Sequence, residues 1–109
     1  MDLGNFSVSL SVKDLATSRK FYETFGFEMI AGKPEENWII LKNGEAKVGL
    51  FQGMFEGNLM TFNPSDARGM ESTIKEAGYK LESETSGESG PTSFMLKDPD
   101  DNMILVDQH

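Results

Sequence analysis

The chain has 109 residues, of which 38% are hydrophobic and 26% charged, a composition typical of one globular domain with one core. Its formal net charge of −8 disfavours binding to nucleic acid or to anionic membranes, and it has no apolar run long enough to cross a bilayer. Without cysteine it has no disulfide or thiolate chemistry, and its single histidine, His109, is the last residue. We therefore expect a soluble cytoplasmic protein.

The first half of the chain predicts one strand, one helix and three further strands. Residues 6–12 alternate between apolar side chains and serine, the pattern of a half-buried strand. Asp14 is expected to cap a helix that ends at Gly26. Leu15, Ser18, Tyr22 and Phe25 recur at helical spacing, and Phe21 widens this stripe, which is expected to pack in the core. The later strands are predicted at about 27–32, 37–42 and 46–52, with Asn43-Gly44 as a tight hairpin turn.

The second half predicts the same order of elements. After a strand near 58–62, Ser65 is expected to cap a helix that Gly78 closes. The apolar stripe of this helix consists of Ala67, Met70, Ile74 and Ala77. Further strands are predicted at about 79–84, 92–97 and 102–107. The polar residues 87–90 predict a mobile loop, and residues 98–102 a turn.

The two halves form an internal repeat. Asp14 and Asp66 are 52 residues apart, as are Gly26 and Gly78, whereas Gln52 and Gln108 are 56 apart. The sequence therefore predicts an α+β fold of two βαβββ modules, the first covering about 1–53 and the second about 57–109. Both modules belong to a single domain, residues 1–109.

Three segments carry a resemblance to a known family. Residues 12–22 followed by Phe25-Gly26-Phe27, residues 48–52 and residues 98–104 resemble the vicinal oxygen chelate superfamily. This superfamily includes glyoxalase I, extradiol dioxygenases and bleomycin-resistance proteins, and the chain is most similar in character to the metal-free bleomycin-resistance branch. The resemblance implies that the paired modules form a curled, cup-shaped mixed sheet with helices on its outer face. It identifies a fold better than an activity, because one fold hosts many chemistries.

The resemblance also implies four metal-binding positions, two in each module. Metal-using relatives place histidine, glutamine or glutamate there, and the corresponding residues here are Ser7, Gly49, Asn58 and Leu105. These side chains coordinate divalent cations weakly or not at all. The other inward candidates, Asp107 and the amides of Gln52 and Gln108, are too few. We therefore predict no metal and no other cofactor.

Strand alternation predicts which side chains line the cup. The predicted ligand-binding residues are Ser7, Ser9, Trp38, Gly49, Phe51, Asn58, Met60, Met103, Leu105 and Asp107. Gly49 is expected to leave room where relatives carry a glutamate, and Trp38 and Phe51 could stack on a planar or cationic ligand. The facing of Trp38 and of Met95 stays open, and the same side chains could instead fill the cup or a dimer interface.

Three functions fit this pattern. The preferred hypothesis is a metal-independent small-molecule binding protein that sequesters a hydrophobic or cationic compound, as the bleomycin-resistance branch does, and that forms a homodimer by analogy with the family. One alternative is a glyoxalase-like or dioxygenase-type enzyme, which would need a metal. The other is a metal-independent lyase or isomerase with Asp107 as the general base. We assign no catalytic residue, and the interpretation favours binding over catalysis.

Overall fold

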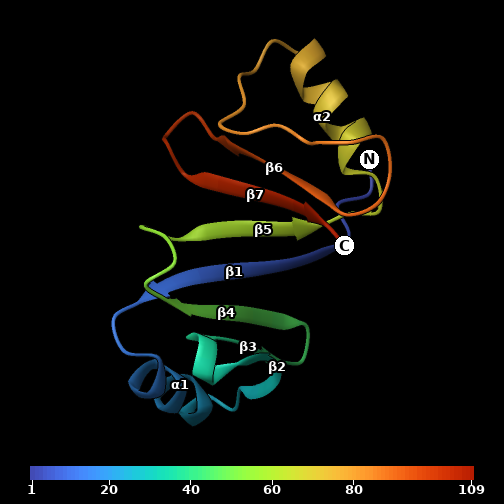
Figure 1. Cartoon of the computed structure of the whole chain (residues 1–109). Coiled ribbons are helices and arrows are strands. Elements are labelled where there is room, and N and C mark those ends of the chain that lie inside the picture. The colour runs from blue at the N-terminus through green and yellow to red at the C-terminus, as the bar shows by residue number, and fades with distance from the viewer. The chain divides into compact units, whose positions relative to one another are not determined.

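The computed structural model describes all 109 residues and contains seven strands, two α-helices and one short 3-10 helix (Figure 1). The chain divides into two compact units. The first unit consists of residues 7–58, and the second combines residues 1–6 with residues 59–109. Neither helix is long and apolar enough to span a membrane. Helices and mixed strand pairing confirm the predicted α+β class.

The elements of the first half follow the prediction closely. They are β1 (Asn5–Val12), α1 (Leu15–Thr24), β2 (Glu28–Lys33), the 3-10 helix η1 (Pro34–Glu36), β3 (Trp38–Asn43) and β4 (Ala46–Gln52). The strand order is β2-β3-β4-β1, in which β1 runs parallel to β4 and the other pairs are antiparallel. The predicted strands and helix of this half are therefore all confirmed.

Local side-chain chemistry sets the ends of α1. The carboxylate of Asp14 accepts a hydrogen bond from the backbone N–H of Thr17 at 3.0 Å, which confirms the predicted N-cap. Gly26 follows the C-cap of the helix with a φ of +88°, a conformation that residues with a Cβ adopt rarely. One helical face thereby packs on the sheet, where Leu15 joins the buried Ile39 and Leu50 of the core.

Two aromatic residues of the predicted helix stripe lie outside this core. Phe21 is 58% exposed and Phe25 is 62% exposed. Because the helix ends at Thr24, Phe25 lies in the cap, and its ring packs edge-on against Phe21 at 5.2 Å rather than against the sheet. The prediction of Phe25 as a core residue is therefore wrong, whereas Tyr22 does pack against the core.

The second half contains three strands rather than four. Its elements are β5 (Leu59–Asn63), α2 (Ala67–Glu76), β6 (Thr92–Lys97) and β7 (Met103–Gln108). The order is β5-β7-β6, with β5 parallel and β6 antiparallel to β7. The strand predicted at 79–84 is reduced to one bridge between Ser83 and Met95. The cap of α2 is Asp66, not Ser65, since its carboxylate accepts from the N–H of Gly69 at 3.0 Å.

The loop predicted to be mobile is tied to α2. The Arg68 guanidinium donates hydrogen bonds to four backbone carbonyls of residues 86–90, at 2.6 to 3.2 Å. The Glu71 carboxylate accepts from the N–H and the hydroxyl of Thr85, at 2.7 and 2.6 Å. These contacts draw residues 85–90 toward the helix, so the chain leaves the sheet until β6.

The core of the second unit lies between α2 and its strands. Ala67 and Met70 of the helix pack with Phe94 and Val106 of the sheet. Ile74 is partly buried against this cluster, as predicted. Ala77, which was predicted in the same stripe, is exposed because the helix ends at Glu76 and Ala77 forms its cap.

Candidate functional site

The candidate site lies on the face of the first unit's sheet that points away from α1. The helix side carries the core residues Ile39, Leu41 and Leu50. Because side chains alternate along a strand, their neighbours point to the other side. The register pairs Trp38 with Phe51, and it pairs Gly49 with both Ile40 and Ser9. Trp38, whose facing the sequence left open, therefore lies on the same face as Gly49 and Phe51.

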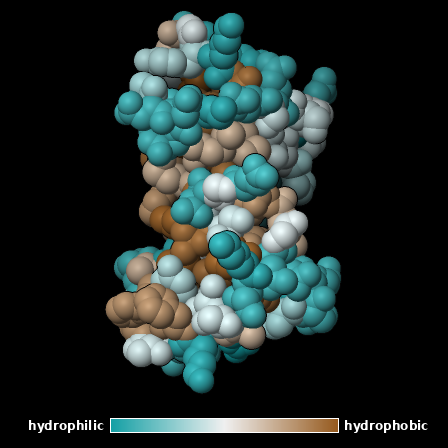
Figure 2. Space-filling model, turned by 90° about the vertical axis from the view of Figure 1, so that its left-hand side faces the viewer, coloured by the Kyte–Doolittle hydropathy of each residue, from teal (hydrophilic) through white to brown (hydrophobic).

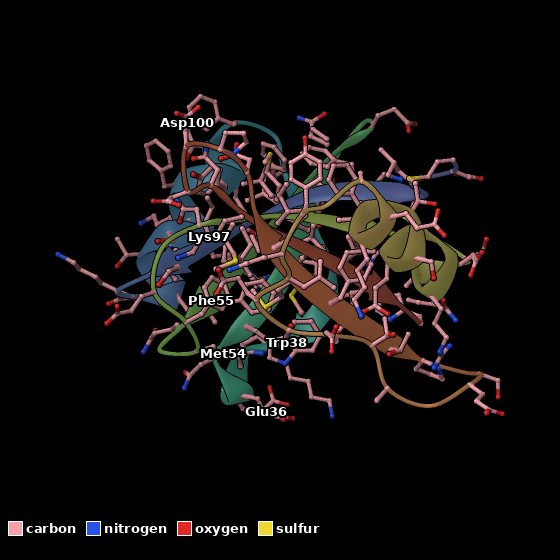
Figure 3. All side chains as sticks on the ribbon, turned by 90° about the horizontal axis from the view of Figure 1, so that it is seen from above. Glu36, Trp38, Met54, Phe55, Lys97 and Asp100 are labelled. Atoms are coloured by element: carbon pink, nitrogen blue, oxygen red, sulfur yellow. The ribbon has the colours of Figure 1, made fainter.

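Three aromatic rings gather on this face, and we call them the aromatic face: Trp38, Phe51 and Phe55. The rings of Trp38 and Phe51 stack with an interplanar angle of 3° and a centroid separation of 6.1 Å. Phe55 adds a third ring at 5.4 Å from Phe51, tilted by 49°. All three are half-buried, and Figure 3 shows Trp38 and Phe55 among the side chains of this region. Such surfaces suit flat apolar molecules.

Phe55 was not among the ligand-binding residues predicted from the sequence. It lies in the segment between β4 and β5, where no periodicity indicates the direction of a side chain. Its position follows from a hydrogen bond that the hydroxyl of Ser11 donates to the Phe55 carbonyl at 2.8 Å. Ser11 therefore fixes the segment beside β1, and the Phe55 ring meets Phe51.

Gly49 does not leave the space that the sequence analysis expected. A Cβ on this residue would lie 2.6 Å from Cε2 of Phe51 and 3.1 Å from Cδ1 of Ile40. The Phe51 ring therefore packs over the glycine backbone. A glutamate at this position would require the Phe51 ring to move from its place on the aromatic face.

The residues at the implied metal positions do not fit a metal ion. Ser7 and Gly49 supply these positions in the first unit. In the second unit the strand register pairs Leu59 with Met103, so Leu59 takes the position that was assigned to Asn58. Asn58 precedes the strand, and its amide oxygen accepts from the Ser11 N–H at 3.3 Å. The structure contains no group of three or more His, Cys, Asp or Glu side chains that could hold a metal ion.

The register of the second unit also revises the facing of Met60. Parallel pairing places Met60 beside Ile104, a residue that packs against the α2 core. Met60 therefore points away from Met103 and Leu105, contrary to the prediction. The opposite face of this unit carries the remaining predicted residues, Met103, Leu105 and Asp107. The register pairs Met95 with Leu105, so Met95, whose facing the sequence left open, lies on that same face.

The two repeated glutamines have a structural role. The amide oxygen of Gln52 accepts a hydrogen bond from the N–H of Leu15 at 2.8 Å, and that of Gln108 accepts from Ala67 at the same distance. Each glutamine thus satisfies the first N–H of the helix in its own module. The 56-residue spacing between the two glutamines was the sequence signal of this arrangement, and both amide oxygens are engaged within the fold.

Negative charge is concentrated in the second unit. Residues 1–6 and 59–109 include eleven acidic and four basic side chains, whereas residues 7–58 include seven acidic and six basic ones. The aromatic face therefore belongs to a nearly neutral unit. In the second unit, burial alone would raise the pKa of Glu71, but the hydrogen bonds from Thr85 lower it, assisted by Lys75 and Arg68.

Comparisons with known proteins support this fold. Residues 7–43 match the family model described as bleomycin resistance protein-like N-terminal. The structure is similar to a glyoxalase/bleomycin resistance protein/dioxygenase superfamily member from Vibrio splendidus 12B01, with a TM-score of 0.75 and 19% identity over 96% of this chain and 98% of the other. No curated protein matches the sequence significantly.

Two enzymes are also among the similar structures. Methylmalonyl-CoA epimerase from Streptomyces coelicolor has a TM-score of 0.70 and 17% identity, with 98% of both chains covered. Homoprotocatechuate 2,3-dioxygenase from B. fuscum has a TM-score of 0.68 and 23% identity over 99% of this chain, which matches 33% of the dioxygenase. The chain therefore has the fold of the glyoxalase, bleomycin-resistance and dioxygenase superfamily, as the sequence motifs predicted. This fold accommodates enzymes as well as resistance-type proteins.

Proposed function

We propose that the protein binds a small, flat, hydrophobic molecule on the aromatic face and sequesters it without a metal. The observation that carries the proposal is the stacked pair of Trp38 and Phe51, which Phe55 extends. These rings are half-buried rather than enclosed in the core, so part of their surface is accessible. Burial of this apolar surface against a planar ligand would supply the binding energy.

The residues at the implied metal positions support binding without a cation. In the first unit the Phe51 ring covers Gly49, and the remaining position is Ser7. A single serine hydroxyl is a weak ligand for a divalent cation. The chemistry that relatives perform on a metal therefore lacks its ligands on this face, whereas the aromatic rings that would stack on a ligand are present.

The charge distribution favours a neutral ligand over a cationic one. Strand alternation places Lys47 on the same face as Gly49 and Phe51, and Lys47 is half-buried. An ammonium group there would repel a bound cation, which offsets the attraction of a cation to the aromatic rings. The first unit as a whole is also close to neutral. We therefore rank a hydrophobic ligand above a cationic one.

Tryptophan fluorescence provides the test, because Trp38 is the only tryptophan of the chain. Menadione is a suitable neutral probe, since it is planar, quenches tryptophan and finds no cysteine to react with, and N-methylquinolinium is its cationic counterpart. Menadione should quench Trp38 saturably in metal-free protein. Phe51→Leu should weaken its binding by roughly 2- to 12-fold, from the ~0.5–1.5 kcal/mol of an aromatic pair.

Phe25→Leu is the matched control, because Phe25 is an exposed phenylalanine outside the aromatic face. Its affinity for menadione should equal that of the wild type. Tighter binding of N-methylquinolinium than of menadione would reverse the ranking of the ligand classes. Absence of saturable quenching by either probe, or equal losses in the two leucine variants, would contradict the proposal.

One observation favours a second candidate function, a metal-independent lyase or isomerase. The carboxylate of Asp107 is half-buried on the face that it shares with Leu105, and it makes no hydrogen bond or ion pair within the protein. A half-buried carboxylate that has no partner within the protein could act as a general base. Proton exchange from a carbon acid in metal-free protein, abolished by Asp107→Asn, would support this candidate. Exchange that persists in the variant would eliminate it.

We also propose a homodimer, which the exposed apolar surface supports. Apolar atoms reach the surface on the face seen in Figure 2, and large side chains such as Ile30 and Met54 are 52% and 50% exposed. Exposed apolar surface of this kind is often buried when subunits associate. Light scattering at micromolar concentration should give twice the chain mass, and a mass of one chain would contradict the dimer.

A further inference from the structure

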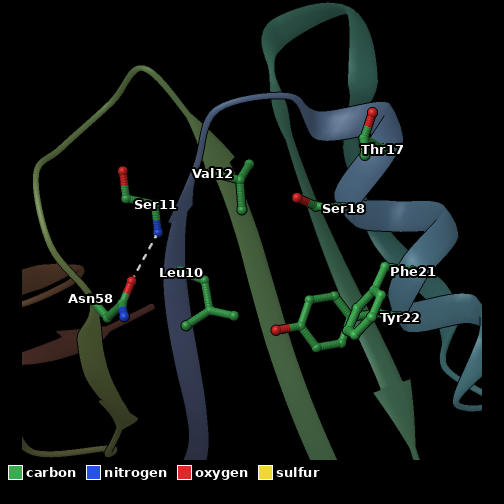
Figure 4. Close-up of a pocket in the computed structure, with 8 residues that line it drawn as sticks. All are labelled: Leu10, Ser11, Val12, Thr17, Ser18, Phe21, Tyr22 and Asn58. Atoms are coloured by element: carbon green, nitrogen blue, oxygen red, sulfur yellow. Dashed lines mark hydrogen bonds between the residues drawn. The ribbon is translucent and has the colours of Figure 1, made fainter.

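A concave site lies between the sheet of the first unit and α1, away from the aromatic face. It is a pocket of about 480 Å³ between the end of β1 and the first turns of α1, a volume within the range of small-molecule sites (Figure 4). The residues that line it are Leu10, Ser11, Val12, Thr17, Ser18, Phe21, Tyr22 and Asn58. Leu10, Val12 and the residues of α1 lie on the face opposite to Trp38 and Phe51, whereas Ser11 is paired with Phe51 and its side chain points to the aromatic face.

The pocket contains polar groups that the fold itself does not use. The hydroxyls of Thr17, Ser18 and Tyr22 make no hydrogen bond within the protein. The amide oxygen of Asn58 accepts from the Ser11 N–H, which leaves the NH2 group of Asn58 to donate elsewhere. Figure 4 shows Ser18 and Tyr22 projecting from α1 toward β1, with Asn58 on the other side of that strand. Several neutral donors and acceptors therefore line the same pocket, from both sides of β1.

An aromatic corner forms the apolar part of the pocket. The rings of Phe21 and Tyr22 meet edge to face, with centroids 5.3 Å apart and planes 88° apart. Phe21 is 58% exposed, although it was predicted to widen the buried stripe of the helix. Two perpendicular rings offer a face and an edge to a third ring, which is the preferred geometry of aromatic contacts.

We propose that this pocket is a second binding site, for a small uncharged ring compound that carries a hydroxyl or carbonyl group. The ring would pack in the corner of Phe21 and Tyr22 and over Leu10, while its oxygen would pair with the unused hydroxyls and the Asn58 amide. A charged ligand is disfavoured, because no charged side chain lines the pocket and an unpaired charge is costly to desolvate. The site does not depend on the proposed role of the aromatic face.

The test uses 4-fluorophenol as the probe, observed by ¹⁹F NMR with the full chain. A ligand of this size is expected to bind with a dissociation constant of about 1 mM, given the usual free energy per ligand atom. Tyr22→Phe should weaken binding by roughly 3- to 10-fold, the usual effect of losing one hydrogen bond. Because the Tyr22 hydroxyl has no partner within the protein, the melting temperature should not change.

Tyr79→Phe is the matched control, since Tyr79 is the only other tyrosine and lies 64% exposed in the second unit. Its affinity for 4-fluorophenol should equal that of the wild type. Ser18→Ala should also weaken binding of 4-fluorophenol. Because this variant leaves both aromatic rings of the pocket in place, it tests the role of the hydroxyl groups separately from that of the rings. Equal affinities of the Tyr22→Phe and Tyr79→Phe variants, or no saturable binding up to about 20 mM probe, about twentyfold above the expected constant, would overturn the proposal.

The location is read from the protein's own resonances. During the titration, backbone amide signals of Val12 and Ser18 should shift, whereas the single indole N–H signal of Trp38 should not. A shift confined to Trp38 would place the probe on the aromatic face and overturn this assignment. As a charge comparison, 4-fluorobenzoate should bind at least 5-fold more weakly than the phenol, because the lining offers its carboxylate no cation. Tighter binding of the benzoate would contradict the neutral specificity.

Discussion

The packing of Phe51 over Gly49 predicts an unusual response to a single methyl group. Gly→Ala at a compatible strand position stabilises a protein by about 0.4–1 kcal/mol, because it restricts the unfolded chain. Here the new Cβ would lie 2.6 Å from Phe51 Cε2, and overpacking of this kind costs about 1–3 kcal/mol. We therefore expect Gly49→Ala to lower the free energy of unfolding by about 1–2 kcal/mol.

A double-mutant cycle with Phe51→Leu tests the cause. Leucine lacks the Cε2 and Cζ atoms that approach the glycine, so the remaining contact is with Cδ1 of Ile40 at 3.1 Å. In the Phe51→Leu background, Gly49→Ala should be close to neutral or slightly stabilising, which gives a coupling of about 1–2 kcal/mol. Urea unfolding followed by circular dichroism measures all four proteins. Equal effects of Gly49→Ala in both backgrounds would show that the ring does not close this position.

Three further predictions concern contacts outside the aromatic face. Arg68→Met should accelerate amide exchange in residues 86–90, measured by mass spectrometry, and unchanged exchange there would contradict the loop's attachment to α2. Because hydrogen bonds lower the pKa of Glu71 below its ordinary 4.5, its stabilisation is present above that pH and is lost as the pH falls through the folded-state value. Below about pH 4.5, the free energy of unfolding in urea should therefore fall less steeply with pH in Glu71→Gln than in the wild type. The same slope in both proteins would disprove this. Gln52→Ala should lower the free energy of unfolding by about 1 kcal/mol, because it leaves a helix N–H unpaired. Gln108→Ala should be more destabilising in thermal unfolding, since Gln108 also donates a hydrogen bond to the 86–90 loop. Equal losses in the two variants would be inconsistent with that extra bond.

Local patterns were sufficient to predict most of the fold. Alternation in residues 6–12, the Asp14 cap and the Asn43-Gly44 turn each depend on neighbours in sequence, and all three are confirmed. The strand predicted at 79–84 formed only the bridge at Ser83. Arg68 and Glu71 hold the following loop on α2, and no local periodicity reports such contacts.

The candidate site was predicted less completely, for two physical reasons. A shift of one residue reverses the facing of a strand, and this is how Met60 was assigned to the wrong side. Side-chain packing cannot be read from alternation, so Gly49 was expected to leave a gap that the Phe51 ring fills. Parity along β4 did place Gly49 and Phe51 on one face, and the register of β3 then added Trp38.

The central claim is that the aromatic face binds a flat ligand with no help from a divalent cation. The most direct measurement is the affinity of the protein for menadione, with Trp38 quenching as the readout. The affinity is measured first in excess EDTA and then after dialysis into Mn²⁺ or Ni²⁺. Equal affinities in the chelator and in either metal are the expected result. Binding that disappears in EDTA and returns with stoichiometric metal would contradict the account.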